Sequence, residues 1–314
     1  MNFINILNHI LRPLEWVVAQ LLTLFHHALV TFGMTAGPSP AWGIAIMCLV
    51  LVIRICLLPL FLSQMRAMQR IQVLQPQIQR IQHKYAARKD PRSKEAMQRE
   101  IMALQQRYNA NPLGSCLPSL IQAPILCSLF YTLQSLPAIA DGNAEPLGGI
   151  DHTMAGDIES SSIFGVRIAD SFGTVASPQS RIIIGVAVAL MCLTLFAIQW
   201  MLIHRNTSKD AMVSPQFRVQ KMTVFVFPAI YVVSGATLPF GVLLYWLTNN
   251  LWNLGQTLCQ LRWFPTPGSA AGERKARRDY EQDNRRRAAA GLPSLEEERA
   301  MAAREDVCLL YTSD

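Results

Sequence analysis

The sequence predicts an all-α, polytopic membrane protein with a core of five transmembrane helices. It also predicts a polar two-helix hairpin after the first span and an amphipathic helix at the N-terminus. Of the 314 residues, 51% are hydrophobic and 16% are charged, and the mean hydropathy is +0.23, which is too apolar for an ordinary soluble domain. Lys and Arg, which give a net charge of +7, lie mostly in three polar blocks between or after apolar runs. Such a distribution is typical of charges that set membrane topology.

Five apolar runs are candidate spans, because a helix needs about 20 mostly apolar residues to cross a bilayer. They lie at 43–62, 113–136, 182–203, 222–238 and 240–261. Only Pro239 separates the last two runs, so a tight turn joins them.

The charges between the runs orient the chain, since short loops rich in Lys and Arg stay in the cytoplasm. Loop 63–112 has ten basic and three acidic residues, and loop 204–221 has four basic and one acidic. Both loops, and the basic tail from Arg262, are expected inside. Loop 137–181 has six acidic and two basic residues, so it is expected outside, and the alternation is consistent.

The N-terminal segment, residues 1–36, has two interpretations. Leu14 to Met34 is long enough to cross the membrane but contains Glu15, Gln20 and a pair of histidines. This polarity favours a helix that lies on the outer face, with Trp16 as an interfacial anchor. A sixth span is the alternative.

Loop 63–112 carries two apolar seams with the 3 and 4 spacing of coiled-coil helices. Pro91, within the polar stretch between them, is expected to end a helix, so the seams predict a hairpin of two antiparallel helices. Pro76 predicts a kink in the first helix. The hairpin is either a docking or gating arm or a connector whose charges fix topology. The seam residues are Ile71, Leu74, Ile78, Ile81 and Tyr85 on the first helix, and Met97, Ile101, Leu104 and Tyr108 on the second.

Arg54 is the most costly residue in the predicted spans. It is about 16 Å along the first span, near mid-bilayer, and none of the five spans contains Asp or Glu to neutralise it. A guanidinium there costs roughly 2.5 to 3.5 kcal/mol unless it faces protein, water or a partner charge. The sequence therefore predicts a hydrated cavity around Arg54.

Uncharged polar residues on other spans are candidates to line the same cavity. On the last span Trp246, Asn249, Asn250 and Asn253 share one helical face at spacings of 3 and 4. Hydrogen bonds between helices are the alternative role for each residue. The candidate site consists of Arg54, Gln122, Gln199, Tyr245, Trp246, Asn249, Asn250 and Asn253.

No catalytic, metal or cofactor motif accompanies this site. The spans contain no carboxylate or Lys for nucleophilic or acid-base catalysis, and the six His residues are scattered. The seven Cys lack metal-ligand spacing and are interpreted as reduced. The sequence therefore predicts a protein that is not an enzyme and has no cofactor, metal or specific nucleic-acid site.

Several blocks resemble the YidC/Oxa insertase family over roughly residues 14–262. They are WGIAIMCLVLVIRICLLPL around Arg54, MQRIQVLQPQIQRIQHKY, NPLGSCLPSLIQAPILCSLFYTL, LTLFAIQW with Gln199, and FPAIYVVSGATLPFGVLLYWLTNNLWNLGQ. The resemblance implies a five-helix core with a hydrophilic groove that is open to the cytoplasm and lipid, flanked by Arg54, Gln199, Tyr245 and Trp246. It also implies an insertase and chaperone of the plasma membrane, with nascent membrane proteins and lipid as partners and with the ribosome and Sec translocon expected.

Two features depart from the family pattern. Val50, one turn before Arg54, is apolar where some members have a hydroxyl, and the large outer domain of many Gram-negative members is missing. A compact, Gram-positive type of this family is therefore the nearer comparison.

The tail, residues 265–314, is polar and basic, and we expect disorder or a marginal helix there. Residues 307–314 differ sharply in composition and are expected to have no function.

The competing function is a small-anion membrane transporter, because an intramembrane Arg can bind an anion. Transporters usually contain repeated halves, and no internal repeat is found in this sequence.

Overall fold

The structure, a computed structural model, describes the chain except residues 1–2, 89, 109, 111–116, 214 and 302–314. The described part is almost entirely helical, which confirms the predicted class. Its only two strands, β1 (Ser162–Ile163) and β2 (Val166–Arg167), form a short antiparallel hairpin. The helices are α1 (Phe3–Thr31), α2 (Ala41–Cys56), α3 (Leu58–Val73), α4 (Gln75–Tyr85), α5 (Pro91–Arg107), α6 (Leu117–Ala140), α7 (His152–Ser160), α8 (Pro178–Arg205), the 3-10 turn η2 (Ala211–Val213), α9 (Pro215–Thr237), α10 (Phe240–Trp263) and α11 (Ala270–Ala289).

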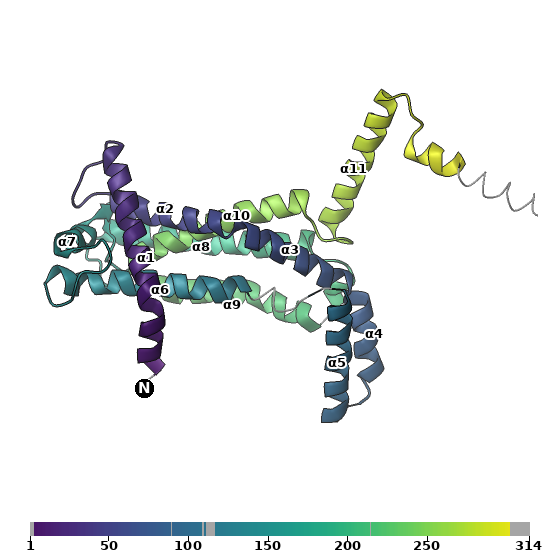
Figure 1. Cartoon of the computed structure of the whole chain (residues 1–314), viewed down its shortest axis with the longest axis horizontal. Coiled ribbons are helices and arrows are strands. Elements are labelled where there is room, and N and C mark those ends of the chain that lie inside the picture. Colours follow the sequence, from purple (N-terminus) through teal and green to yellow (C-terminus); the bar gives the residue numbers. More distant parts are fainter. Residues whose placement is uncertain (1–2, 89, 109, 111–116, 214, 302–314) are drawn as a thin grey trace, which may run out of the picture.

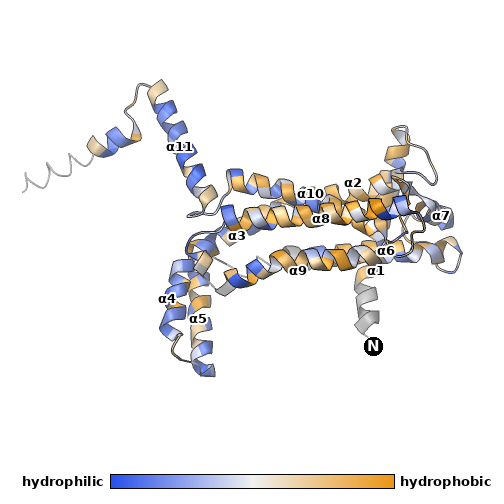
Figure 2. Cartoon of the chain, turned by 180° about the vertical axis from the view of Figure 1, so that it is seen from behind, coloured by the Kyte–Doolittle hydropathy of each residue, from blue (hydrophilic) through white to orange (hydrophobic). Residues whose placement is uncertain are grey.

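Long helices α2, α6, α8, α9 and α10 run side by side as a bundle, and the polar segments gather at its two ends (Figure 1). The hairpin of α4 and α5 and the tail helix α11 project from one end, while α1, α7 and loop 141–177 lie at the other. Figure 2 shows the same division as an apolar bundle with a hydrophilic hairpin and tail. This arrangement agrees with the grouping of loops by charge.

Within the described residues, four helices are long and apolar enough to cross a membrane, or up to five if the bent pair α2 and α3 is one span. The four segments are Leu11–Thr31, Ile121–Ala140, Pro178–Arg205 and Phe217–Thr237. Helix α10 is more polar than these, because its middle contains the Asn residues of the candidate site. The structure is thus that of a polytopic membrane protein, and the exact set of five core spans stays a prediction.

Helix α1 crosses the bundle at the end opposite the hairpin, called the outer end here after its predicted side, instead of running with it (Figure 1). Its inner face packs into the main core through Val18, Ala19 and Leu22, and the His26 ring stacks on Trp42 of α2 with centroids 3.8 Å apart. Trp16 is 52% exposed on the other face. The length and composition of α1 would allow a sixth span, but its crosswise direction favours the interfacial helix.

The first predicted span, 43–62, is not straight. Helices α2 and α3 meet at Leu57 with a bend of 54°. Pro59 lies two residues beyond the break; it has no N–H for the carbonyl of Ile55, and its ring crowds that carbonyl. The apolar run is therefore divided between two helices, and α3 continues as a polar helix to Val73.

The predicted hairpin is present, but its helices begin and end elsewhere. Where a kink was expected near Pro76, the structure has a break at Leu74 that separates α3 from α4, and α4 packs against α5 around buried Leu74 and Ile78. Pro91 does not lie in the turn as expected, because it is the first residue of α5. A proline suits the first helical turn, whose N–H groups need no helical partner, and the preceding Asp90 accepts a hydrogen bond from Ser93 N. Tyr108 is 48% exposed and lies outside the seam.

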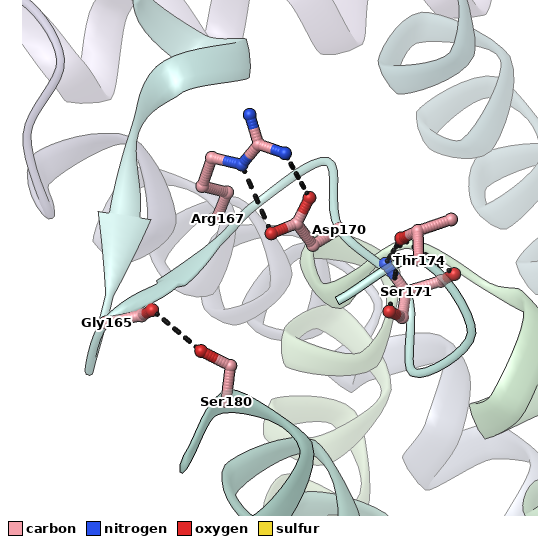
Figure 3. Close-up of polar contacts among 6 residues, drawn as sticks. All are labelled: Gly165, Arg167, Asp170, Ser171, Thr174 and Ser180. Atoms are coloured by element: carbon pink, nitrogen blue, oxygen red, sulfur yellow. Dashed lines mark hydrogen bonds and ion pairs between the residues drawn. The ribbon is translucent and has the colours of Figure 1, made fainter. Parts of the chain in front are cut away.

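Loop 137–181 folds into a compact cap over the outer end of the bundle. Arg167 pairs with Asp170 through Nη2 and Oδ1 at 2.8 Å, and Ser180 Oγ at the start of α8 donates to the carbonyl of Gly165 at 3.1 Å (Figure 3). The pair with Asp170 raises the pKa of Arg167. The first turn of α10 is tied to the same loop, since Phe240 N donates to Asp170 O and Gly241 N donates to Ile168 O. These contacts join the segment 165–170 of the cap to the first turns of α8 and α10.

Replacing Asp151 with Ala should loosen α7 by about 1 kcal/mol, the usual cost of losing an N-cap. Asp151 Oδ1 accepts from Met154 N at 2.7 Å, which holds the pKa of that carboxyl below its usual range. A lowered pKa means that this stabilisation is present above the usual pKa of Asp and is lost as pH falls through the lowered value. Hydrogen exchange of the α7 amides, at neutral and at acidic pH, measures the effect. Asp141→Ala, at an exposed carboxylate of the same loop, is the control and should leave α7 unchanged.

Of the two expectations for the tail, disorder or a marginal helix, residues 270–289 adopt the helix, α11. Ser269 caps its first turn by accepting from Gly272 N, and the pairs Lys275 with Asp279 and Arg277 with Glu281 follow the i,i+4 spacing that supports isolated helices. The tail lacks an apolar seam, and local pairing of this kind explains the helix without one. Residues 307–314 lie outside the described part of the chain.

Candidate functional site

Arg54 lies in the last turn of α2 and is held by an uncharged partner. Its Nε donates to Asn249 Oδ1 of α10 at 2.7 Å, and Nη2 donates to the same oxygen. The break at Leu57 places the guanidinium at the C-terminal end of α2, where the helix dipole favours a cation. In the ion pairs that the described residues form, Arg54 has no acidic partner. Its positive charge is therefore anchored without being neutralised.

A second polar contact joins α6 to α10 one helical turn away. Gln122 Nε2 donates to the hydroxyl of Tyr245, and Tyr245 is 1% exposed. Tyr245 and Asn249 are four residues apart on α10, so they share the face that looks toward α2 and α6. The structure thus brings together four of the predicted site residues: Arg54, Gln122, Tyr245 and Asn249.

The expected single polar face of α10 is divided in two. Trp246 stacks on Tyr231 of α9 with ring centroids 5.0 Å apart. Asn250, beside Tyr231, is 2% exposed, and its Nδ2 has no hydrogen-bond partner among the described residues. These two residues look toward α9, a direction different from that of Asn249. The sequence grouped them because residues three and four apart share a broad helical face, which two neighbouring helices can divide.

Gln199 and Asn253 are partly buried on α8 and α10. Among the described residues, no hydrogen bond joins either side chain to Arg54 or to the Gln122 and Tyr245 pair. Their place in the site stays a prediction. Tyr231 was missed, although an aromatic residue with a hydroxyl inside an apolar run is a signal that could have identified it.

The bundle is closed at one end of these residues and open on the side between α6 and α9. At the outer end, Phe240 to Tyr245 are all buried, in two adjoining cores that include residues of the cap. Helices α6 and α9 make almost no contact with each other in the part of the chain that the structure describes. A mostly apolar cavity of about 300 Å³ lies near this opening, lined by Leu126, Cys127, Phe130, Tyr131, Leu238, Val242 and Trp246.

Helix α9 packs mainly on α8 and exposes large apolar side chains along most of its length. Phe225 is 75% exposed and Val233 is 69% exposed, as expected for residues that face lipid or an apolar ligand. The arrangement can therefore offer an apolar path beside a fixed positive charge and neutral hydrogen-bonding groups.

The described residues contain no group of three His, Cys, Asp or Glu side chains that could hold a metal ion. The five cysteines among them, at 48, 56, 127, 192 and 259, are free thiols. Cys116 and Cys308 fall outside the described residues.

The chain matches the family model described as 60Kd inner membrane protein over residues 34–266. It is 44% identical over 307 residues to a membrane protein insertase YidC of Bifidobacterium longum, which covers 97% of this chain and 91% of the relative. A protein of the same name from Streptomyces avermitilis is 34% identical, over 85% of this chain and 61% of the relative. One from Tropheryma whipplei is 30% identical, over 87% and 90%.

Proposed function

Because the chain belongs to the YidC/Oxa insertase family, we propose that it inserts newly made membrane proteins into the plasma membrane and helps them fold. Arg54 and its neighbours form the hydrophilic part of the groove in this proposal. The substrates are nascent membrane proteins, and the lipid bilayer receives them.

The observation that carries the proposal is a guanidinium whose hydrogen bonds to described residues all go to one amide carbonyl. A structural Arg inside a membrane normally has an acidic partner, but Arg54 is partly exposed and has the neutral Asn249 in that place. Its charge remains available to an acidic or polar segment of the substrate as that segment crosses the bilayer. The apolar segment that follows passes into lipid between α6 and α9, beside the exposed side chains of α9.

The two ends of the bundle supply the direction of insertion. The hairpin of α4 and α5, loop 204–221 and the basic tail lie at one end, which we assign to the cytoplasm by charge. At the other end the acidic cap covers the bundle, so the groove is closed to the outside. The hairpin and α11 are the surfaces on which we expect the ribosome and the Sec translocon to dock.

Depletion of the protein followed by protease protection of a short, single-span substrate tests the proposal. Loss of the protected fragment is the expected result, because the hydrophilic end of the substrate then stays in the cytoplasm. Unchanged protection together with altered uptake of a small anion would favour the transporter instead.

A further inference from the structure

A second cavity, this one lined by polar residues, lies at the hairpin end of the bundle, apart from the Arg54 contact. Its volume is about 360 Å³, within the range of roughly 300–1,000 Å³ that is typical of ligand pockets. We call it the amide chamber, because six of its lining residues have amide side chains: Gln64, Gln69, Gln72, Asn206, Gln220 and Gln260.

The bend at Leu57 creates the chamber. It turns α3 by 54° from the direction of α2, so the α3 face that carries Gln64 and Gln72 looks onto the ends of α8, α9 and α10. Gln260 follows Asn249 by eleven residues on α10, which corresponds to about 17 Å along the helix. A chain that passes from the hairpin end to Arg54 would therefore meet the chamber first.

The chemistry of the lining defines the ligand. No lining residue carries a charge, so the chamber has no group to neutralise a phosphate, a carboxylate or an ammonium. Gln64 Nε2 and Gln72 Oε1 are buried in the chamber wall without a hydrogen-bond partner among the described residues, so the two amides can turn one donor and one acceptor toward a ligand without breaking a hydrogen bond at either atom. A buried polar atom without a partner costs about 1–3 kcal/mol, and a ligand that pairs with both atoms recovers that cost.

We propose that the amide chamber binds the main chain of the substrate segment on its way to Arg54. The peptide group is uncharged and presents one N–H and one C=O at each residue, which matches the open donor and acceptor. Because the contacts are to the main chain, they accept segments of any side-chain sequence. The inference rests on the proposed insertase function and adds the chemical group that the cytoplasmic end of the path recognises.

Site-specific photocrosslinking in the full-length, membrane-embedded protein tests the proposal. A p-benzoylphenylalanine in place of Met68, which lines the chamber without an amide, should crosslink to ribosome-stalled nascent chains over a limited range of chain lengths. The same probe in place of Val73, an exposed residue of α3 outside the lining, should give little product. Ala-rich and Ser-rich substrate segments should give equal yields at Met68.

Gln64→Leu should lower the Met68 crosslink by roughly threefold, the equivalent of one modest hydrogen bond. The variant should fold, because Leu replaces an amide whose Nε2 has no partner. Gln77→Leu, at an exposed glutamine of α4, is the matched control and should leave the yield unchanged.

A probe in place of Leu126, beside the apolar cavity of the groove, distinguishes failure of this inference from failure of the insertase proposal. Crosslinks at Leu126 but none at Met68 would mean that the chamber holds only water, and would overturn this inference while the insertase proposal stands. An undiminished Met68 crosslink in Gln64→Leu would also overturn it. The absence of crosslinks at both positions would overturn the insertase proposal and this inference together.

Discussion

Replacing Arg54 with Ala should lower the insertion of a short, Sec-independent membrane protein by about tenfold or more. Hydrogen bonds to a charged group are worth about 1.5–3 kcal/mol, and 1.4 kcal/mol corresponds to a factor of ten. Arg54 Nε and Nη2 both donate to the neutral Oδ1 of Asn249. Once Arg54 is replaced, Asn249 supplies no positive charge that could bind the substrate in its place. Protease protection of the substrate, in cells that contain only the variant, measures the loss.

Two companion variants separate a substrate-binding Arg from a structural one. Arg54→Lys keeps the charge but loses the planar fork that meets Asn249, so it should retain part of the activity. Asn249→Asp places a carboxylate at the oxygen that Arg54 already contacts and should lower insertion, because the new ion pair neutralises the guanidinium.

The opposite result for Asn249→Asp would contradict the substrate-binding role. If Arg54 only joins α2 to α10, a carboxylate partner strengthens that joint, and insertion should be maintained or improved. Full insertion by Arg54→Ala would likewise show that the charge of Arg54 is dispensable.

The sequence predicts the all-helical membrane class and the grouping of the polar loops at two ends, because both depend on local composition. Water and lipid separate polar from apolar residues over lengths of about 20 residues, and that signal is local. Arg54 was identifiable for the same reason, since a charge inside an apolar run is costly wherever its helix lies.

Other features depend on how the helices meet, which the sequence does not disclose. The break at Leu57 follows from Pro59, but a proline within a span produces a kink in some helices and none in others. Asn249 contacts α2 and Asn250 contacts α9 because of the rotation of α10 about its own axis, which the sequence does not specify. The amide chamber was missed because its residues come from four helices and two connecting segments, and each glutamine alone resembles an ordinary surface residue of a polar helix.

Gly241→Ala should destabilise the outer end of the bundle by about 1–3 kcal/mol, the usual cost of overpacking a filled core. A Cβ at Gly241 would lie 2.7 Å from Ile168 Cγ2, 3.1 Å from Leu133 Cδ1 and 3.4 Å from Ile46 Cδ1. Ile168 is 1% exposed, and its Cγ2 is attached directly to Cβ, so this methyl cannot move away without a change of rotamer or backbone. Thermal unfolding in detergent, followed by thiol accessibility, measures the loss.

Gly255→Ala on the same helix is the matched control, because a Cβ there meets no atom within 4 Å. Alanine in a helix interior is favoured over glycine by roughly 0.5–1 kcal/mol, so this variant should be neutral or slightly stabilised. The two substitutions are chemically identical and differ in their surroundings. If α10 must stay seated under the cap for Asn249 to hold Arg54, then Gly241→Ala should also lower insertion while Gly255→Ala should not. Equal stability of the two variants would show that the packing of α10 under the cap contributes little stability. The closure of the groove at its outer end would then have to come from other contacts.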